Sequence, residues 1–102
     1  MKSVNSTPLT CTATIKLLGD YWTLRILDVL KIGQLRYCEI QRLLDNVNPV
    51  TLTNRLQKLE QALLITRKED LVDRISVSYS LSAKGKSALP VLEALREFSK
   101  KI

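Results

Sequence analysis

The chain has 102 residues, enough for one small domain with a modest hydrophobic core. Its 45% hydrophobic and 25% charged residues are ordinary for a globular protein and exclude a disordered one. The net charge of +6 favours polyanionic partners such as nucleic acid, although in a small protein it can also serve only solubility.

Residue types that many catalytic and metal sites need are missing. The chain has no histidine, which removes histidine acid–base chemistry, Ser-His triads and histidine metal ligands. Cys11 and Cys38 alone cannot form a four-ligand zinc site, and the scattered glycines form no phosphate-binding loop. We therefore expect no enzyme activity, no metal and no cofactor. No apolar run is long enough to span a bilayer and residues 1–10 lack a signal-peptide core, so we expect a cytoplasmic protein without a membrane partner.

Two helices are predicted first, from apolar residues at helical spacing. Residues 10–18 carry one apolar stripe, and Gly19 ends that helix. Asp20 can cap the next helix, which runs from Tyr21 to about Lys31 and ends before Gly33. The stripes are Cys11, Ile15 and Leu18 in the first helix, and Trp22, Ile26, Val29 and Leu30 in the second.

A helix-turn-helix follows in the sequence. A third helix, from about Tyr37 to Leu44, is joined by residues 45–48 to a helix that begins at Pro49. Asn48 can cap the free N–H groups of that helix, and proline suits its first position because it has no N–H group. The third helix is predicted to bury Tyr37, Ile40, Leu43 and Leu44, and the fourth to bury Leu52, Leu56, Leu59 and Leu63.

The outer face of the fourth helix carries hydroxyl, amide and cationic side chains, with no carboxylate before Glu60. Its residues are Val50, Thr51, Thr53, Asn54, Gln57 and Lys58. Such a face suits base edges and phosphates; the alternative is a surface helix that happens to lack acids. The N-terminal end of a recognition helix points into the groove, so Thr51 and Asn54 are predicted to reach base edges first.

The hydrophobic period then changes from helical to two, which predicts a half-buried strand with apolar positions Ile75, Val77, Tyr79 and Leu81. Its predicted partner is Leu64–Glu69, joined to it through a tip that holds Asp70 and Asp73. A β-hairpin in this place gives the order of a winged helix. The bases beside the tip, Arg67, Lys68 and Arg74, suit phosphate contacts, whereas a hairpin that only covers the core is the alternative.

Ser82 is predicted to cap one terminal helix over residues 83–102, kinked by Pro90 near its first turns. Its apolar stripe is longer than so small a core requires, and the first helix offers a complementary stripe. We therefore expect a two-fold dimer interface formed by Ile15, Leu18, Leu92, Leu95, Phe98 and Ile102.

Four segments, in this order, resemble the signature blocks of the HxlR-type winged helix-turn-helix transcriptional regulators. They are Tyr21–Leu27, Arg36–Ile40, Leu52–Glu60 and Tyr79–Gly85. The resemblance implies a homodimer on an inverted repeat, with the second helix of the motif in the major groove and the hairpin beside the backbone. The chain departs from the family at Leu63, which stands in place of a common glycine. We therefore expect a different helix-to-strand junction, because leucine does not easily adopt a left-handed turn.

Arg55 lies on the flank of the fourth helix and matches the arginine of an Arg-Leu pair in the family. A cation there suits a phosphate contact; the alternative is a supporting ion pair with Glu39 or Glu60. The predicted phosphate contacts are Arg36, Tyr37, Arg42, Arg55, Lys68 and Arg74.

Many members of this family sense electrophiles or oxidants through an N-terminal cysteine, and Cys11 lies close to that place. Cys11 shares an apolar stripe, which favours a small buried side chain. Cys38 projects away from the core near Arg36 and is the more exposed thiol by pattern. A structural or incidental role is favoured for both, and a redox or small-molecule effector is left open.

The sequence thus predicts an α+β, mostly α, winged helix-turn-helix: a three-helix core with a β-hairpin wing, flanked by dimerisation helices over 10–18 and 83–102. One domain is expected over residues 1–102, with residues 1–9 flexible. The predicted function is that of a sequence-specific regulator that binds double-stranded DNA as a homodimer. The alternative is an interaction module that binds protein through its apolar end helices, and the acid-free outer face favours DNA.

Overall fold

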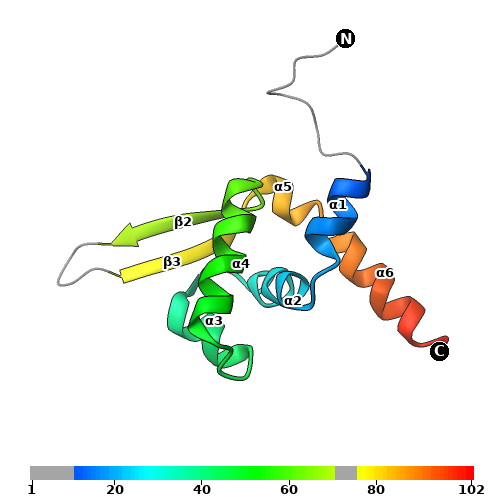
Figure 1. Ribbon diagram of the computed structural model, residues 1–102, viewed down its shortest axis with the longest axis horizontal. Coiled ribbons are helices and arrows are strands. Elements are labelled where there is room, and N and C mark those ends of the chain that lie inside the picture. The colour runs from blue at the N-terminus through cyan, green and yellow to red at the C-terminus, as the bar shows by residue number, and fades with distance from the viewer. Residues whose placement is uncertain (1–10, 71–75) are drawn as a thin grey trace, which may run out of the picture.

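The computed structural model describes residues 11–70 and 76–102 and shows a winged helix-turn-helix of the α+β class (Figure 1). Its helices are α1 (Cys11–Leu18), α2 (Tyr21–Leu30), α3 (Tyr37–Leu43), α4 (Pro49–Gln61), α5 (Ala83–Lys86) and α6 (Leu89–Ser99). Its strands are β1 (Leu35–Arg36), β2 (Ile65–Asp70) and β3 (Ser76–Leu81). The predictions for residues 1–9, Asp73, Arg74 and Ile75 fall outside the described residues.

The strands form an antiparallel sheet in the order β1-β3-β2. The predicted hairpin is confirmed, with Ile65 opposite Leu81 and Asp70 opposite Ser76. Asp70 was expected at the tip, but it is the last residue of β2, because the ladder continues beyond Glu69. Strand β1 was not predicted; it has only two residues and pairs with the middle of β3.

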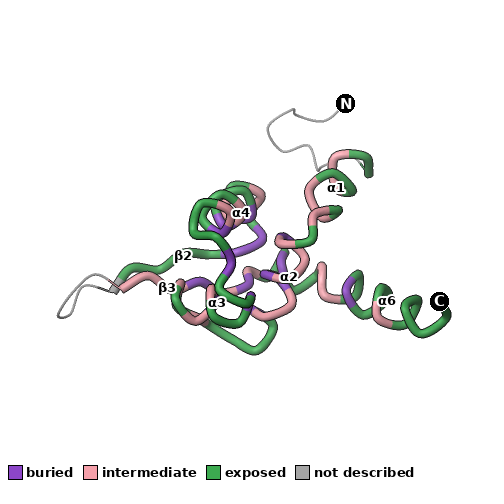
Figure 2. Tube along the Cα trace, turned by 60° about the horizontal axis from the view of Figure 1, so that its bottom comes forward, coloured by how far each residue is buried: buried purple, intermediate pink, exposed green. Residues whose placement is uncertain are grey.

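The core lies between α2, α3, α4 and the hairpin (Figure 2). The predicted stripe of α4 is confirmed at Leu52, Leu56 and Leu59, which have at most 1% of their surface exposed. From α2, Ile26 and Leu30 are equally buried. These side chains fix which face of α4 turns inward, and therefore which face is left outside.

The turn between α3 and α4 follows from two residues that tolerate a left-handed backbone. Asp45 and Asn46 have φ angles of 59° and 58°. The Asn46 N–H donates to the Gln41 carbonyl at 2.9 Å, which ends α3 and turns the chain toward α4. The prediction that Leu43 is buried is wrong: it is 46% exposed, while Leu44 and Val47 fill the core at the turn.

The junction between α4 and β2 corrects a second prediction. Leu63 adopts the left-handed conformation (φ 66°) that we expected leucine to avoid, and it is 68% exposed instead of continuing the core stripe. The Leu63 N–H donates to the Glu60 carbonyl and the Leu64 N–H to the Leu59 carbonyl, both at 3.0 Å. This pattern is a Schellman cap. The cap places Leu64, next to Leu59, in the core position that the periodicity had assigned to Leu63.

The C-terminal segment forms two helices, not the single kinked helix that was predicted. Ser82 caps the short α5 by accepting from the Gly85 N–H at 3.0 Å. The chain then breaks at Ser87 and Ala88, and Pro90 lies in the first turn of α6, where its missing N–H costs nothing. A side chain at Gly85 would meet the Leu64 carbonyl, so this glycine allows α5 to pack closely against the α4–β2 junction.

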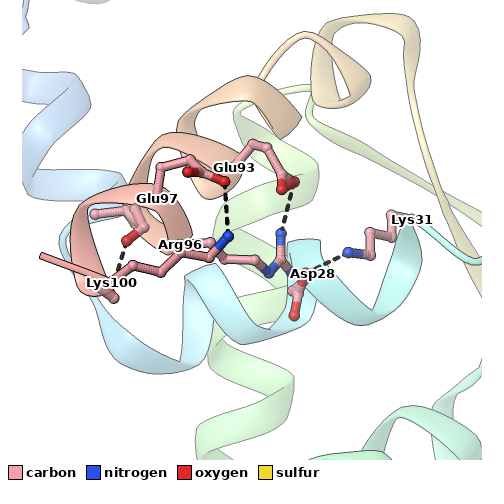
Figure 3. Close-up of polar contacts among 8 residues, drawn as sticks. Asp28, Lys31, Glu93, Arg96, Glu97 and Lys100 are labelled. Atoms are coloured by element: carbon pink, nitrogen blue, oxygen red, sulfur yellow. Dashed lines mark hydrogen bonds and ion pairs between the residues drawn. The ribbon is translucent and has the colours of Figure 1, made fainter.

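One ion pair links α6 to α2, and further pairs lie next to it along each helix (Figure 3). Asp28 of α2 accepts from the Arg96 guanidinium of α6 and from Lys31 at 3.3 Å. Arg96 also reaches Glu93 at 3.2 Å, and Glu97 pairs with Lys100 at 3.2 Å. The pair between Asp28 and Arg96 therefore helps to set the position of α6 relative to α2.

The first and last helices leave apolar residues in solvent. Ile15 is 65% exposed and Leu18 half-buried, and Cys11 is exposed, so the expectation that Cys11 is buried is wrong for the single chain. On α6, Leu92 is buried, but Leu95 and Phe98 are exposed. Ile102, predicted to belong to the last helix, lies beyond its end. Among the described residues, no helix has the length and apolar character that a membrane crossing needs.

Candidate nucleic-acid interface

The start of α4 is built as the sequence predicted. The Asn48 side-chain oxygen accepts from the Val50 N–H at 2.8 Å and from the Thr51 N–H at 3.4 Å. Pro49 occupies the first turn. The cap fixes where α4 begins, so the orientation of its outer face is set by its first residues.

Most of the predicted base-reading residues lie in solvent on one face of α4. The exposed ones are Val50, Thr53, Asn54, Gln57 and Lys58, and Thr51 is half-buried. Four of them, with Pro49, line a shallow open depression along the helix. The face presents hydroxyl, amide and ammonium groups, which can donate to or accept from base edges and phosphate oxygens.

Tyr37 connects α3 to the start of α4. Its hydroxyl donates to the Pro49 carbonyl at 3.3 Å and lies 3.2 Å from the Thr53 hydroxyl. Arg36 begins α3, and its backbone N–H donates to the Glu39 carboxylate at 2.8 Å. Glu39 is therefore a capping residue. Arg36 and Arg42 are both exposed.

Arg55 forms the most extensive polar contact of α4. Its guanidinium donates to the two Asp20 carboxylate oxygens at 2.8 Å and 3.2 Å. A third donor reaches the Asn54 side-chain oxygen at 3.2 Å. The alternative considered for Arg55, a pair with Glu39 or Glu60, named the wrong acids, since the partner lies 35 positions earlier in the chain.

Asp20 serves two elements at once. It caps α2 by accepting from the Thr23 N–H and hydroxyl, each at 3.0 Å, and it holds Arg55. Hydrogen bonds from Arg55 lower the pKa of the Asp20 carboxyl to about 2; partial burial opposes this shift and the Thr23 contacts reinforce it. The cap was predicted from the sequence but the ion pair was not, because no local pattern relates residues so far apart.

The remaining predicted site residues lie on the hairpin and at the two cysteines. Lys68 is exposed on β2, and Arg67 pairs with Glu69 at 3.0 Å. Arg74 falls outside the described residues. Both cysteines are exposed free thiols. Within residues 11–70 and 76–102, no group of three or more His, Cys, Asp and Glu side chains could hold a metal ion.

The capped α4, the turn before it and the hairpin after it occur together in known proteins. A family profile described as HxlR-like helix-turn-helix matches residues 17–102. The chain belongs to this family. An uncharacterized HTH-type transcriptional regulator of Methanothermobacter thermautotrophicus is 39% identical over 83 residues, which cover 81% of this chain and 63% of that protein. The chain thus spans less than two thirds of that relative.

A second relative, from Halalkalibacterium halodurans, is also named as an HTH-type transcriptional regulator. It is 33% identical over 102 residues, which cover 99% of this chain and 88% of that protein. The crystal structure of the HTH-type regulator YtcD superposes with a TM-score of 0.84 at 30% identity, over 91% of this chain and 96% of that one. The chain is therefore a winged helix-turn-helix transcriptional regulator of the HxlR type.

Proposed function

We propose that this regulator binds double-stranded DNA sequence-specifically, as a homodimer on an inverted repeat, with α4 in the major groove. The observation that carries the proposal is the outer face of α4, whose polar and cationic side chains remain in solvent with no carboxylate before Glu60. We place the regulator in the cytoplasm, together with the DNA that it binds. We also propose that residues 1–102 form a single domain.

Base readout is assigned to the N-terminal half of α4. The cap at Asn48 starts α4 just before Thr51 and Asn54, which supports the assignment of these two residues to base edges, with Thr53 and Gln57 beside them. The amide of Asn54 can pair bidentately with adenine. Its oxygen already accepts from Arg55, and that contact orients the amide while leaving the second lone pair of the oxygen for a base.

Phosphate contacts are assigned to the cations that border this face. Arg36 at the end of β1, Arg42 on α3 and Lys68 on the hairpin are exposed, and Arg74 is assigned by sequence alone. Tyr37 is better placed to hold the start of α4 than to reach far into solvent, because its hydroxyl contacts Pro49 and Thr53. Arg55 is largely engaged by Asp20, so its share of phosphate binding is the weakest of the set.

The dimer interface is assigned to α1 and α6. Ile15, Leu95, Phe98 and Ile102 are between 44% and 89% exposed in the single chain. Several large apolar side chains left exposed on the first and last helices of a small protein support an interface there. A two-fold dimer would present two copies of α4, and the matching DNA site is an inverted repeat with half-sites about one helical turn apart.

The test selects bound duplexes from a random pool and then titrates the selected duplex and a scrambled one at several salt concentrations. Asn54→Ala should lose about 1–3 kcal/mol of binding at one base pair of the selected site only. Gln61→Ala, at the other end of α4, is the matched control because it removes an exposed amide from the same helix.

Equal losses of affinity by Asn54→Ala on both duplexes would show that Asn54 does not read a base. A selected pool with no shared sequence would reject sequence-specific binding. If no duplex bound at low salt, the interaction-module alternative would replace DNA binding.

A further inference from the structure

The depression between α1 and α4 has not been assigned a role. It is lined by Lys16 of α1, by Asp20 and Thr23 at the start of α2, and by Arg55 and Lys58 of α4, and its volume is about 370 Å³. That is ample for a phosphate group. It joins a helix assigned to the dimer interface with the helix assigned to DNA.

The charges around this depression do not balance. It carries three cations and one carboxylate. Asp20 is already occupied, since both of its oxygens accept from Arg55 and one also accepts from Thr23. Across the described ranges 11–70 and 76–102, no carboxylate lies within ion-pair distance of the ammonium groups of Lys16 and Lys58. The two lysines therefore leave positive charge around a concave surface.

The position of the depression beside α4 favours a phosphate of the DNA backbone as its ligand. A helix in the major groove has a sugar–phosphate strand on each side. Figures 1 and 2 both show the β2–β3 hairpin on one side of α4 and α1 on the other. The hairpin and α3 thus border one strand. Arg55 and Lys58 face α1, so the depression borders the other strand.

We infer that Lys16 and Lys58 form a seat for a phosphate of the second DNA strand, with Arg55 held at its edge by Asp20. The inference rests on the proposed function and extends it to α1, which then contacts DNA as well as the partner subunit. The seat is open and shallow, and its floor has no buried polar donors beyond Thr23. Such a surface suits a phosphate that the rest of the duplex holds in place more than a free small anion.

The test measures binding of the full chain to the selected and scrambled duplexes by fluorescence anisotropy across salt concentrations. Lys16→Ala should weaken binding to both duplexes roughly three- to tenfold and reduce the salt slope by about 0.9. Lys16→Arg should restore the slope, because it keeps the charge. Lys86→Ala is the matched control, since it removes the same charge near the opposite end of α2.

Light scattering of each variant checks that assembly is unchanged. If Lys16→Ala matched Lys86→Ala in affinity and salt slope, the seat would be rejected, while salt-dependent binding by the unaltered chain would leave the proposed function standing. If the unaltered chain bound no duplex, the proposed function would fail and the inference with it.

Inorganic phosphate separates the two sources of the same ligand chemistry. We expect no saturation of the amide NMR shifts of Lys16 and Lys58 below about 10 mM phosphate at constant ionic strength, which would support a DNA phosphate. Saturable shifts that Lys16→Ala abolishes, together with an unchanged DNA salt slope, would assign the seat to a free phosphate compound and overturn the DNA assignment.

Discussion

The inner helices α2 and α4 and the outer helices α1 and α6 carry similar apolar stripes with different fates. Leu52 and Leu56 of α4 are 1% exposed because α2 and the hairpin cover them within the same chain. On α6, only Leu92 is covered, while Leu95 and Phe98 are 44% and 59% exposed. A periodic stripe therefore predicts that a helix has an apolar face, but it does not tell whether its own chain or another one covers it.

The largest expected effect separates these two fates. Leu56→Ala should lower the free energy of unfolding by about 3 kcal/mol, because it leaves a cavity in a close-packed core. Leu95→Glu should leave the fold intact and halve the molar mass in light scattering, since the charge would lie in the proposed interface. Urea unfolding at several protein concentrations measures both.

The unfolding midpoint of the unaltered chain should rise with protein concentration, and that of Leu95→Glu should not. The comparison fails if Leu95→Glu unfolds as readily as Leu56→Ala at every concentration. It also fails if the unaltered chain is a monomer at micromolar concentration.

Predictions from the sequence succeeded where the determining contacts are local. The cap at Asn48 and the proline start of α4 depend on neighbours in the chain, and the structure shows both. The predicted alternation in β3 is seen at its end, where Tyr79 and Leu81 are buried and Ser80 is half-buried. The predicted apolar stripe of α4 was extended too far, to Leu63, because the periodicity of apolar residues does not show where a helix ends. The break between α5 and α6 was missed for the same reason.

The candidate site was less predictable than the fold because its contacts link distant segments. Which face of α4 is outside follows from its own leucines, so the exposed Thr53 and Asn54 were found from the sequence. The pair between Arg55 and Asp20 required α2 and α4 to pack first. Lys16 was missed because only the packing of α1 beside α4 brings it to this surface.

A smaller expected effect comes from comparing two ion pairs, Asp20–Arg55 between the inner helices and Glu97–Lys100 on α6. Asp20 has a pKa of about 2 in the folded chain against a model-peptide value of 3.8. The unfolded chain thus binds the proton more tightly, so this contribution is present above about pH 4 and is lost as the pH falls toward 2. We expect it to be about 1–2 kcal/mol after allowance for partial exposure.

Urea unfolding at a series of pH values tests this contribution. Asp20→Asn should reduce stability at pH 7 and flatten its decline between about pH 4 and 2. Glu97→Gln is the control, because its pair with Lys100 is exposed on α6 and should matter little. A decline in Asp20→Asn as steep as in the unaltered chain would assign the acid sensitivity to other carboxylates, such as Asp28, whose pKa is also lowered: burial opposes this shift, but hydrogen bonds from Arg96 and Lys31 outweigh it.

The smallest expected effect concerns Leu63, which follows the inner helix α4 but is mostly exposed and gains little from burial. Leu63 is 68% exposed and has a φ of 66°, a conformation that costs a residue with a Cβ about 1–2 kcal/mol. Leu63→Gly should raise the free energy of unfolding by roughly 0.5–1 kcal/mol, because relief of this strain exceeds the added flexibility of the unfolded chain. Leu43→Gly is the matched control: Leu43 is also exposed, but it is the last residue of α3 and has no positive φ, so glycine there should destabilise by up to about 1 kcal/mol. Equal losses in both variants would mean that the Schellman cap holds Leu63 without strain, and that the glycine common in the family at this junction serves a purpose other than stability.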